Sequence, residues 1–398
     1  METPKTNRDS CVSAIVLFKS RQPWCHHVIS KLSLTQSLKV VYAAPRIREA
    51  GIDGLIYEIN QLIEETNAER IFLFIDFFYG LDHDFVRCIT PRAMKILVTL
   101  DDLTLHEFNL LTAMACDLVL SADPVSVLKY QEAGLGAGFF LLESSRSLYK
   151  PQQLVKTTDV LFFGNQKLAD RKEYLEYLRE SGVSVRSIGG KERYIDASSL
   201  VDEIARAKIV INFSKTGLLD HDKDGQLGRQ FLFQLKGRIV EAGLCGTACI
   251  SEHAPAIQLL FNENEVPVFR SPRECLALIS ELLGDDKKRN AISKTLFEKC
   301  ISKFEDRPLM KQVEELIDQQ KVQNEGGYNQ EPGELPMWYR KKVVRGRIQL
   351  VWSSYRMMFR ELMRVLNPAK SYPMKDSAGL FFNTLCWMGY HFLRRGTR

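Results

Sequence analysis

The chain has 398 residues, of which 45% are hydrophobic and 26% are charged. This composition excludes a mostly disordered chain, a collagen-like fibre and a disulfide-stapled miniprotein, and the length suits two domains with an appendage. The nine cysteines form no CxxC pair, and the polar N-terminal segment lacks the apolar core of a signal peptide. These features predict a cytoplasmic protein with reduced thiols.

The net charge of +5 is distributed unevenly along the chain. Residues 337–398 contain 13 Lys and Arg but only two acids, Glu361 and Asp376, so this tail carries +11. The preceding 336 residues sum to −6. A basic tail that also holds three of the four tryptophans needs an anionic partner, a membrane surface or an acidic face of the body itself.

In the first part of the chain, short apolar runs alternate with amphipathic stretches. This alternation predicts an α/β domain with a parallel sheet covered by helices on both faces. The clearest helices are Gly54–Thr66 and Pro124–Ala133, and the chain turns polar around residues 151–158, so we place this domain at residues 1–152. The expected strands are Cys11–Phe18, Leu38–Ala43, Arg70–Ile75, Ala93–Thr99, Leu118–Ser121 and Gly138–Leu142.

The same alternation then restarts and predicts a second Rossmann-like domain over residues 153–320. A stretch rich in Gly, Pro and Glu, residues 321–336, is expected to be a linker to the tail. The expected strands are Asp159–Phe163, Val183–Ile188, Ile209–Phe213, Thr247–Ser251 and Val266–Phe269. The expected helices are Arg171–Ser181, Ser198–Ala207, Lys236–Gly243, Pro272–Leu283 and Lys287–Lys303.

The segment Lys236–Glu252 carries the most chemical information. Ligands of doubly wound sheets bind beyond the carboxyl ends of the strands, where this segment is expected to lie. Arg238 and Glu241 are three residues apart and share a helix face. A carboxylate there can accept two hydrogen bonds from a ribose diol, and an arginine suits a diphosphate. An ordinary surface ion pair explains the same spacing equally well.

The order and spacing of five segments resemble the CgeB-like (spore-maturation-type) glycosyltransferases of the GT-B superfamily. The resemblance covers about residues 95–318, from the second half of the first domain through the second. The segments are LVTLDDLTLHEF (97–108), DLVLSADPVSVLKYQEAG (117–134), DVLFFGNQKLADRKEYLEYL (159–178), KIVINFS (208–214) and QLKGRIVEAGLCGTACISE (234–252).

The resemblance implies two Rossmann-like domains that face a cleft, and transfer of a sugar from a nucleotide donor bound mainly to the second domain. It implies that Glu241 holds the donor ribose and that Arg238 lies near the phosphates or the sugar. Many related enzymes carry another glutamate eight residues earlier, where this chain has Phe233. This departure leaves the retaining or inverting outcome open.

Four further residues are candidates for donor binding. Gly164 opens a loop that leads into a helix, and Arg171 lies seven residues further on. Backbone N–H groups of such a loop and a nearby arginine suit a phosphate, although a plain turn and an exposed side chain remain alternatives. Ser214 and Lys215 follow a strand and could also reach the phosphates, whereas a solvated lysine is the commoner outcome.

Asp101, Asp102 and His106 follow an expected strand of the first domain. Asp102 or His106 is our candidate for the base that takes the proton of the acceptor hydroxyl. One of the two aspartates is instead expected to cap the helix that follows.

The acids of Asp220–Asp224 match the start of an EF-hand loop, but Phe231 stands where the closing glutamate would be. We therefore interpret this loop as an acidic loop near the acceptor, and we expect neither a metal nor a cofactor.

The tail contains a predicted amphipathic helix from Ile348 to Leu366, with Arg356, Arg360 and Arg364 in one stripe. The apolar run Gly379–Leu393 is too short to span a bilayer but suits insertion into its interface. We predict peripheral attachment to an anionic membrane, with packing on the first domain as the alternative. The tail has no recognisable nucleic-acid module, so no nucleic-acid partner is expected.

Together these features predict a cytoplasmic, membrane-associated glycosyltransferase. It would move a sugar from a nucleotide-sugar donor to a glycan or lipid-linked acceptor at the cytoplasmic membrane face, in the synthesis of cell-surface polysaccharide or glycoconjugates. The alternative hypothesis is a non-catalytic, glycosyltransferase-like scaffold that binds a membrane or an anionic polymer through its basic tail.

Overall fold

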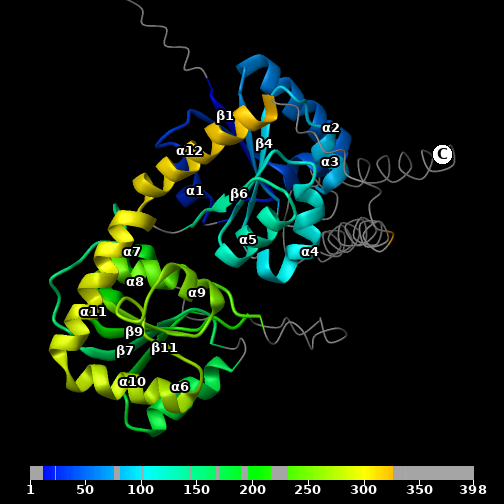
Figure 1. Ribbon diagram of the computed structural model, residues 1–398. Helices are drawn as coiled ribbons and strands as arrows, with labels where there is room; N and C mark the ends of the chain where they lie inside the picture. The colour runs from blue at the N-terminus through cyan, green and yellow to red at the C-terminus, as the bar shows by residue number, and fades with distance from the viewer. Residues whose placement is uncertain are drawn as a thin grey trace, which may run out of the picture.

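The computed structural model describes residues 12–22, 24–75, 81–100, 102–142, 145–166, 170–189, 196–216 and 232–325, together with Met337. These residues form two parallel sheets, and each sheet lies between two layers of helices (Figure 1). The predicted α/β class with two Rossmann-like units is therefore confirmed.

The first sheet has six parallel strands in the order β2-β1-β3-β4-β5-β6. Every residue of β1 is buried, as expected for a strand covered on both faces. All six expected strands are present, and no strand end differs from the prediction by more than three residues. The strands are β1 (Ala14–Phe18), β2 (Leu38–Tyr42), β3 (Arg70–Phe74), β4 (Met94–Thr99), β5 (Leu118–Ser121) and β6 (Ala137–Phe139).

Four helices cover one face of this sheet, and α1 (Cys25–Leu32) lies on the opposite face. The four are α2 (Ala43–Thr66), α3 (His83–Arg87), α4 (Asp102–Ala113) and α5 (Pro124–Glu132). The helix that we expected from Gly54 begins earlier, and its two parts meet at Gly51, which has a φ of 75°. The helices α1 and α3 were not predicted because eight and five residues are too few to show a clear period.

The second sheet has five parallel strands in the order β11-β10-β9-β7-β8. Its strands are β7 (Thr158–Phe163), β8 (Val185–Ile188), β9 (Ala207–Asn212), β10 (Ala248–Glu252) and β11 (Val268–Phe269). One face is covered mainly by α7 (Ala197–Arg206), α8 (Arg238–Leu244), α9 (Pro255–Leu260) and α11 (Asp286–Lys299), and the other by α6 (Arg171–Glu180) and α10 (Pro272–Gly284).

The last described helix, α12 (Asp306–Glu325), returns to the first sheet (Figure 1). Its side chains Met310, Val313 and Ile317 are buried in the core that α1 also covers. The helix approaches β6 so closely that a Cβ atom on Gly138 would clash with Leu316 Cδ2. The sequence predicts that residues 306–320 belong to the second domain and residues 321–325 to the linker. In the structure these residues form one helix, which packs on the first domain.

Polar contacts also attach α12 to the first domain. Arg70 Nη1 lies 2.5 Å from Glu314 Oε2, while Thr35 Oγ1 and Gln36 Nε2 each donate to Glu314 Oε1 over 2.9 Å. At the start of the helix, Asp306 Oδ1 lies 3.1 Å from the ammonium of the buried Lys31. These contacts hold the returning helix at both its beginning and its middle.

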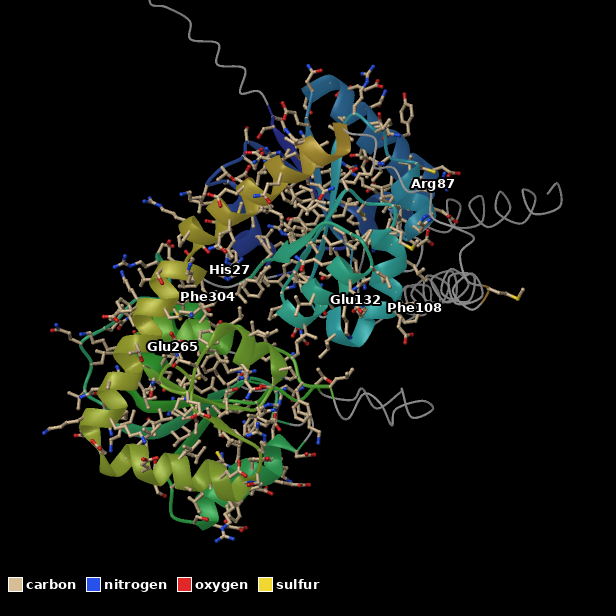
Figure 2. The ribbon with its side chains drawn as sticks, in the orientation of Figure 1. His27, Arg87, Phe108, Glu132, Glu265 and Phe304 are labelled. Carbon is tan, nitrogen blue, oxygen red and sulfur yellow. The ribbon has the colours of Figure 1, made fainter. Side chains whose placement is uncertain are left out.

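An aromatic contact joins the two domains where the chain enters α12. Phe304 ends the π-helical turn Cys300–Phe304 and lies at the junction of the two domains in Figure 2. Its ring centroid is 6.0 Å from that of Phe139 in the first domain and 5.1 Å from that of Phe261 in the second. The cores of the two domains are therefore continuous at this point.

The predicted basic tail and most of the predicted linker lie outside the described residues. In the part of the chain that is described, no helix is both long enough and apolar enough to cross a membrane.

We predict that Ile317→Ala lowers the free energy of unfolding by about 2–4 kcal/mol, because it leaves a cavity in the first core. The measurement is calorimetric unfolding. Val322→Ala on the same helix is the matched control, since Val322 is 72% exposed and its truncation is expected to change the free energy by less than about 0.5 kcal/mol. Equal effects of the two changes would contradict the packing of α12 on the first sheet.

Candidate active site

The candidate site lies at the carboxyl edge of the second sheet. Because the five strands are parallel, Gly164 after β7, Gly189 after β8, Ser214 after β9 and Glu252 at the end of β10 reach the same edge. The chain passes from β7 to β8 on one side and then to β9 on the other. This reversal of direction makes β7 the topological switch point of the sheet, and ligands of such sheets bind in the crevice outside the strand ends at this point.

Two glycines allow the backbone to come together at this crevice. Gly164 has a φ of +135° and Gly189 a φ of +108°. A Cβ atom on Gly189 would lie 2.9 Å from the Gly164 N and O atoms, and one on Gly164 would lie 2.7 Å from Arg238 Nη2. The absence of both side chains therefore lets two loops and the guanidinium group of Arg238 meet at one place.

Arg238 is held at the crevice by an amide and by two aromatic rings. Its Nη1 donates to Asn212 Oδ1 over 2.7 Å. Its guanidinium carbon lies 5.2 Å from the ring centroid of Phe162 and 5.6 Å from that of Phe163. Asn212 was missed from the sequence because an asparagine at the end of a buried strand carries no recognisable pattern.

Arg171 is a second arginine at the same crevice, and it is only 4% exposed. Its Nη1 donates to Asn165 O over 2.9 Å and its Nη2 to Lys215 O over 3.2 Å, while its buried Nε has no hydrogen-bond partner among the described residues. Burial and the nearby positive charge of Arg238 lower the pKa of Arg171 to about 10, so it stays protonated at neutral pH. Two neighbouring guanidinium groups favour an anion with several oxygens.

Ser214 and Lys215 take part in the architecture of this edge. The Glu252 carboxylate accepts the backbone N–H groups of Ser214 and Lys215 over 2.9 and 2.8 Å, and burial raises its pKa. The buried Ser214 hydroxyl donates to Glu252 O over 2.7 Å, and the Lys215 ammonium lies 2.5 Å from Asp170. The structure thus brings both predicted residues to the crevice, where they join β9 to β10 and to the loop before α6.

Glu241 lies three residues after Arg238 on α8 and is only 4% exposed, which does not fit a surface ion pair. Its Oε1 accepts a hydrogen bond from the hydroxyl of Tyr149 over 2.9 Å. Tyr149 belongs to the segment that connects the two sheets. Its role was missed from the sequence, because it is separated from Glu241 by more than ninety residues.

In the first domain, Asp102 and His106 form a pair at the start of α4. The carboxylate of Asp102 is 1% exposed and accepts from His106 Nδ1 over 2.9 Å. Asn109 and Tyr130 donate to its other oxygen over 2.8 and 2.6 Å. Burial raises the pKa of this carboxyl group, but the donated hydrogen bonds outweigh burial and hold the pKa below its ordinary value.

This pair has a clear division of chemical roles. Because an ionised carboxylate only accepts hydrogen bonds, Nδ1 of His106 carries the ring proton. Nε2 is then the ring nitrogen that can accept a second proton. The imidazole also packs on Tyr130, with ring centroids 4.7 Å apart. Asp102 is the first residue of α4, and its side chain is directed to these partners; Asp101, the other expected cap, lies outside the described residues.

The two domains touch next to these groups. Asp123 caps α5 through one carboxylate oxygen, and its other oxygen accepts the backbone N–H of Leu235 over 3.1 Å. Gln234 Nε2 donates to the backbone oxygen of Leu100, the residue that follows β4, over 3.0 Å. Burial raises the pKa of Asp123, and the charge of Asp102 adds to this effect. The segment before α8 therefore joins the second domain to the loops that carry Asp102 and Asp123.

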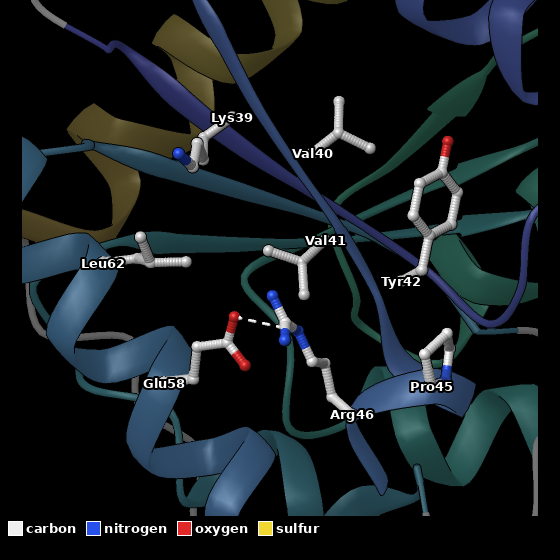
Figure 3. Close-up of a pocket in the computed structure, with 8 residues that line it drawn as sticks. All are labelled: Lys39, Val40, Val41, Tyr42, Pro45, Arg46, Glu58 and Leu62. Atoms are coloured by element: carbon white, nitrogen blue, oxygen red, sulfur yellow. Dashed lines mark ion pairs between the residues drawn. The ribbon is translucent and has the colours of Figure 1, made fainter. Parts of the chain in front are cut away.

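A pocket of about 370 Å³ lies elsewhere, at the outer edge of the first sheet beside β2 (Figure 3). Val41, Tyr42 and Leu62 line it together with Arg46, which pairs with Glu58 over 3.2 Å. None of the predicted site residues lines this pocket.

Over the ranges that the structure covers, no three His, Cys, Asp or Glu side chains are grouped to hold a metal. The loop Asp220–Asp224 lies outside those ranges.

Comparisons with known proteins agree with this architecture. Residues 156–315 match a family model described as glycosyl transferase-like. The fold is similar to that of HepE from Anabaena, solved with UDP and glucose, with a TM-score of 0.57, 13% identity, and coverage of 77% of this chain and 100% of that one. It is also similar to sucrose-phosphate synthase from Thermosynechococcus elongatus, with a TM-score of 0.54, 11% identity, and coverage of 78% and 99%.

A TarM variant from S. aureus, solved with Fondaparinux, alpha-GlcNAc-glycerol and UDP, matches with a TM-score of 0.51 and 10% identity over 67% of this chain and 59% of that one. No curated protein sequence matches. At these identities the likeness concerns the fold, and the chain has the two-domain GT-B fold.

We predict that Gly164→Ala lowers the free energy of unfolding by about 1–3 kcal/mol, because alanine is strained at a φ of +135° and its methyl group meets Arg238. Thermal unfolding measures this change. Gly284→Ala at the end of α10 is the matched control, since a Cβ there meets nothing within 4 Å. Equal stability of the two variants would contradict the close approach at Gly164.

Proposed function

We propose that this protein is a glycosyltransferase of the GT-B type that moves a sugar from a nucleotide-sugar donor to a glycan or lipid-linked acceptor. The observation that carries the proposal is the pair of neighbouring guanidinium groups, Arg171 and Arg238, at the switch point of the second sheet. The matched family model spans the same domain and supports the assignment. No cofactor is needed for this chemistry.

In this proposal the second domain binds the donor. Arg171 and Arg238 neutralise the diphosphate, the loop opened by Gly164 contacts it through backbone N–H groups, and the Glu241 carboxylate accepts hydrogen bonds from the ribose. Ser214 and Lys215 support this surface through their contacts with Glu252 and Asp170. HepE has been solved with UDP-glucose, which makes uridine nucleotides the first donors to test.

The first domain supplies the base. Asp102 orients the imidazole through Nδ1, so that His106 Nε2 accepts the proton of the acceptor hydroxyl. The acceptor oxygen forms the new bond to the anomeric carbon, the bond from that carbon to the phosphate oxygen breaks, and the nucleoside diphosphate leaves with its charge neutralised by the two arginines. Asp102 is thus a positioning residue, and His106 is the proposed catalytic residue.

The competing hypothesis is a non-catalytic scaffold with the same fold. The feature that favours it is Phe233, which stands where many related enzymes carry a second glutamate. A scaffold would show no transfer or hydrolysis with any nucleotide sugar, so turnover separates the two hypotheses.

The test of donor binding is a thermal-shift screen of the full chain against UDP-, GDP-, ADP-, CMP- and dTDP-sugars, with and without a divalent metal. A ligand at a hundred times its dissociation constant stabilises a protein by about 2.7 kcal/mol. We expect one nucleotide class to shift the wild-type chain and Glu241→Gln to weaken its binding about tenfold or more. Glu298→Gln is the matched control, because Glu298 is 61% exposed on α11.

In the same assay, His106→Asn is expected to keep the donor-induced shift and to lower the transfer rate at least about 100-fold, since it removes the base alone. Unchanged donor affinity in folded Glu241→Gln would refute the ribose assignment. Unchanged transfer by His106→Asn would refute the assignment of the base.

We also propose that the tail, residues 337–398, attaches the enzyme to an anionic membrane from the cytoplasmic side, consistent with a lipid-linked acceptor in cell-surface polysaccharide synthesis. The charge of +11 supports this proposal, since each basic residue near an anionic surface contributes about 1 kcal/mol.

We expect the triple change R356Q/R360Q/R364Q to weaken binding to vesicles of phosphatidylglycerol and phosphatidylcholine about 10- to 100-fold, because it removes three charges from one stripe of the tail. Co-sedimentation measures the effect. The change K172Q/K294Q/K311Q is the control, since these lysines on the two domains are 72–79% exposed. Equal loss of vesicle binding in both variants would indicate that binding depends on the total charge of the protein and not on the tail.

A further inference from the structure

The segment between the two sheets runs along the helix that carries the proposed ribose ligand. After β6 the chain forms a turn in which Tyr149 N donates to Ser145 O over 2.8 Å. Three successive residues of this segment then meet α8 and its end. Tyr149 contacts Glu241 over 2.9 Å, the backbone of Lys150 contacts Cys245, and Pro151 lies 3.5 Å from a Cβ built on Gly246.

Tyr149 is firmly held in this position. Its side chain is 3% exposed and belongs to a single apolar cluster that contains Leu141 of the first domain and Leu235 and Ile239 of the second. The ring is therefore fixed by residues from both domains, and its hydroxyl reaches into the site. A packing role alone would be served by phenylalanine, which has no group to offer to Glu241.

We propose that Tyr149 is a positioning residue for ribose recognition: its hydroxyl fixes the carboxylate of Glu241 in the orientation that accepts the ribose diol, and so links the interdomain segment to donor binding. This inference rests on the proposed function. A carboxylate that is already oriented by a hydrogen bond loses less conformational freedom when a further hydrogen-bond donor binds to it. A movement of the interdomain segment would then alter ribose affinity without any change in the groups that bind phosphate.

We expect removal of the Tyr149 hydroxyl to weaken nucleotide binding only when the nucleotide carries a ribose 2′-hydroxyl. In the full chain, Tyr149→Phe keeps the aromatic ring and removes the hydroxyl group that donates the hydrogen bond to Glu241. It is expected to weaken the binding of UDP about tenfold while leaving the binding of 2′-deoxy-UDP nearly unchanged. Isothermal titration calorimetry with both nucleotides measures the ratio of the two dissociation constants; if the thermal-shift screen selects another base, the corresponding ribo and deoxyribo diphosphates are used.

Tyr174→Phe is the matched control. Tyr174 is also buried in the second domain, and its hydroxyl donates to Arg270 O over 3.4 Å rather than to Glu241. It is expected to leave both affinities unchanged, whereas Glu241→Gln is expected to abolish the preference for ribose.

The outcomes are distinguishable. If Tyr149→Phe weakened the binding of UDP and of 2′-deoxy-UDP equally, the site would be generally damaged and the inference would be overturned. Unchanged binding of both nucleotides would overturn it as well. Wild-type protein that binds UDP without preferring it over 2′-deoxy-UDP would overturn the ribose role of Glu241 and this inference with it, while nucleotide binding would stand. Wild-type protein that binds no nucleotide would overturn the proposed function itself.

Discussion

Two positive charges held close together in a partly buried crevice are the constraint around which the second domain is arranged. Burial disfavours the charge on Arg171 and lowers its pKa, and repulsion by the nearby positive charge of Arg238 adds to this effect. The surrounding structure offsets this cost with oriented dipoles, since Asn212 and two backbone carbonyl groups accept from the guanidinium groups. Aromatic rings face Arg238 as well. A diphosphate would relieve the remaining repulsion, which is why the arrangement favours an anionic ligand.

The first domain is joined to the second through three connections. The segment with Tyr149 contacts Glu241, the segment with Leu235 contacts Asp123, and α12 returns to the first sheet past Phe304. The start of α12 is held by the ion pair between Asp306 and the buried Lys31, and the Lys31 ammonium also donates to Leu141 O. Because all three connections converge on the junction, the relative position of the domains and the geometry of the proposed site depend on the same contacts.

Features formed by residues close together in the chain are visible in the sequence, whereas contacts between distant segments are not. The strands of both sheets were located to within a few residues, since a buried parallel strand needs an unbroken apolar run that is visible in the sequence. Glu241 and Arg238 were predicted to share one helix from their spacing, and both lie on α8. The destination of α12 was not predicted, although its apolar face is periodic, because an amphipathic helix shows that it packs without showing on which surface.

The parallel α/β class, the two α/β units and the spacing of Arg238 and Glu241 on one helix could be read from the amino-acid sequence, because these features depend on residues close together in the chain. The three-dimensional arrangement was needed to show that Tyr149 contacts Glu241 and that Asn212 holds Arg238. It was also needed to show that Asp102 is buried behind His106 and Ser214 against Glu252. Apart from the contact between Asp102 and His106 within one helix, these partners lie tens of residues apart. Their meeting depends on the order of the strands in the sheet and the path of the chain between the domains, which no local pattern encodes.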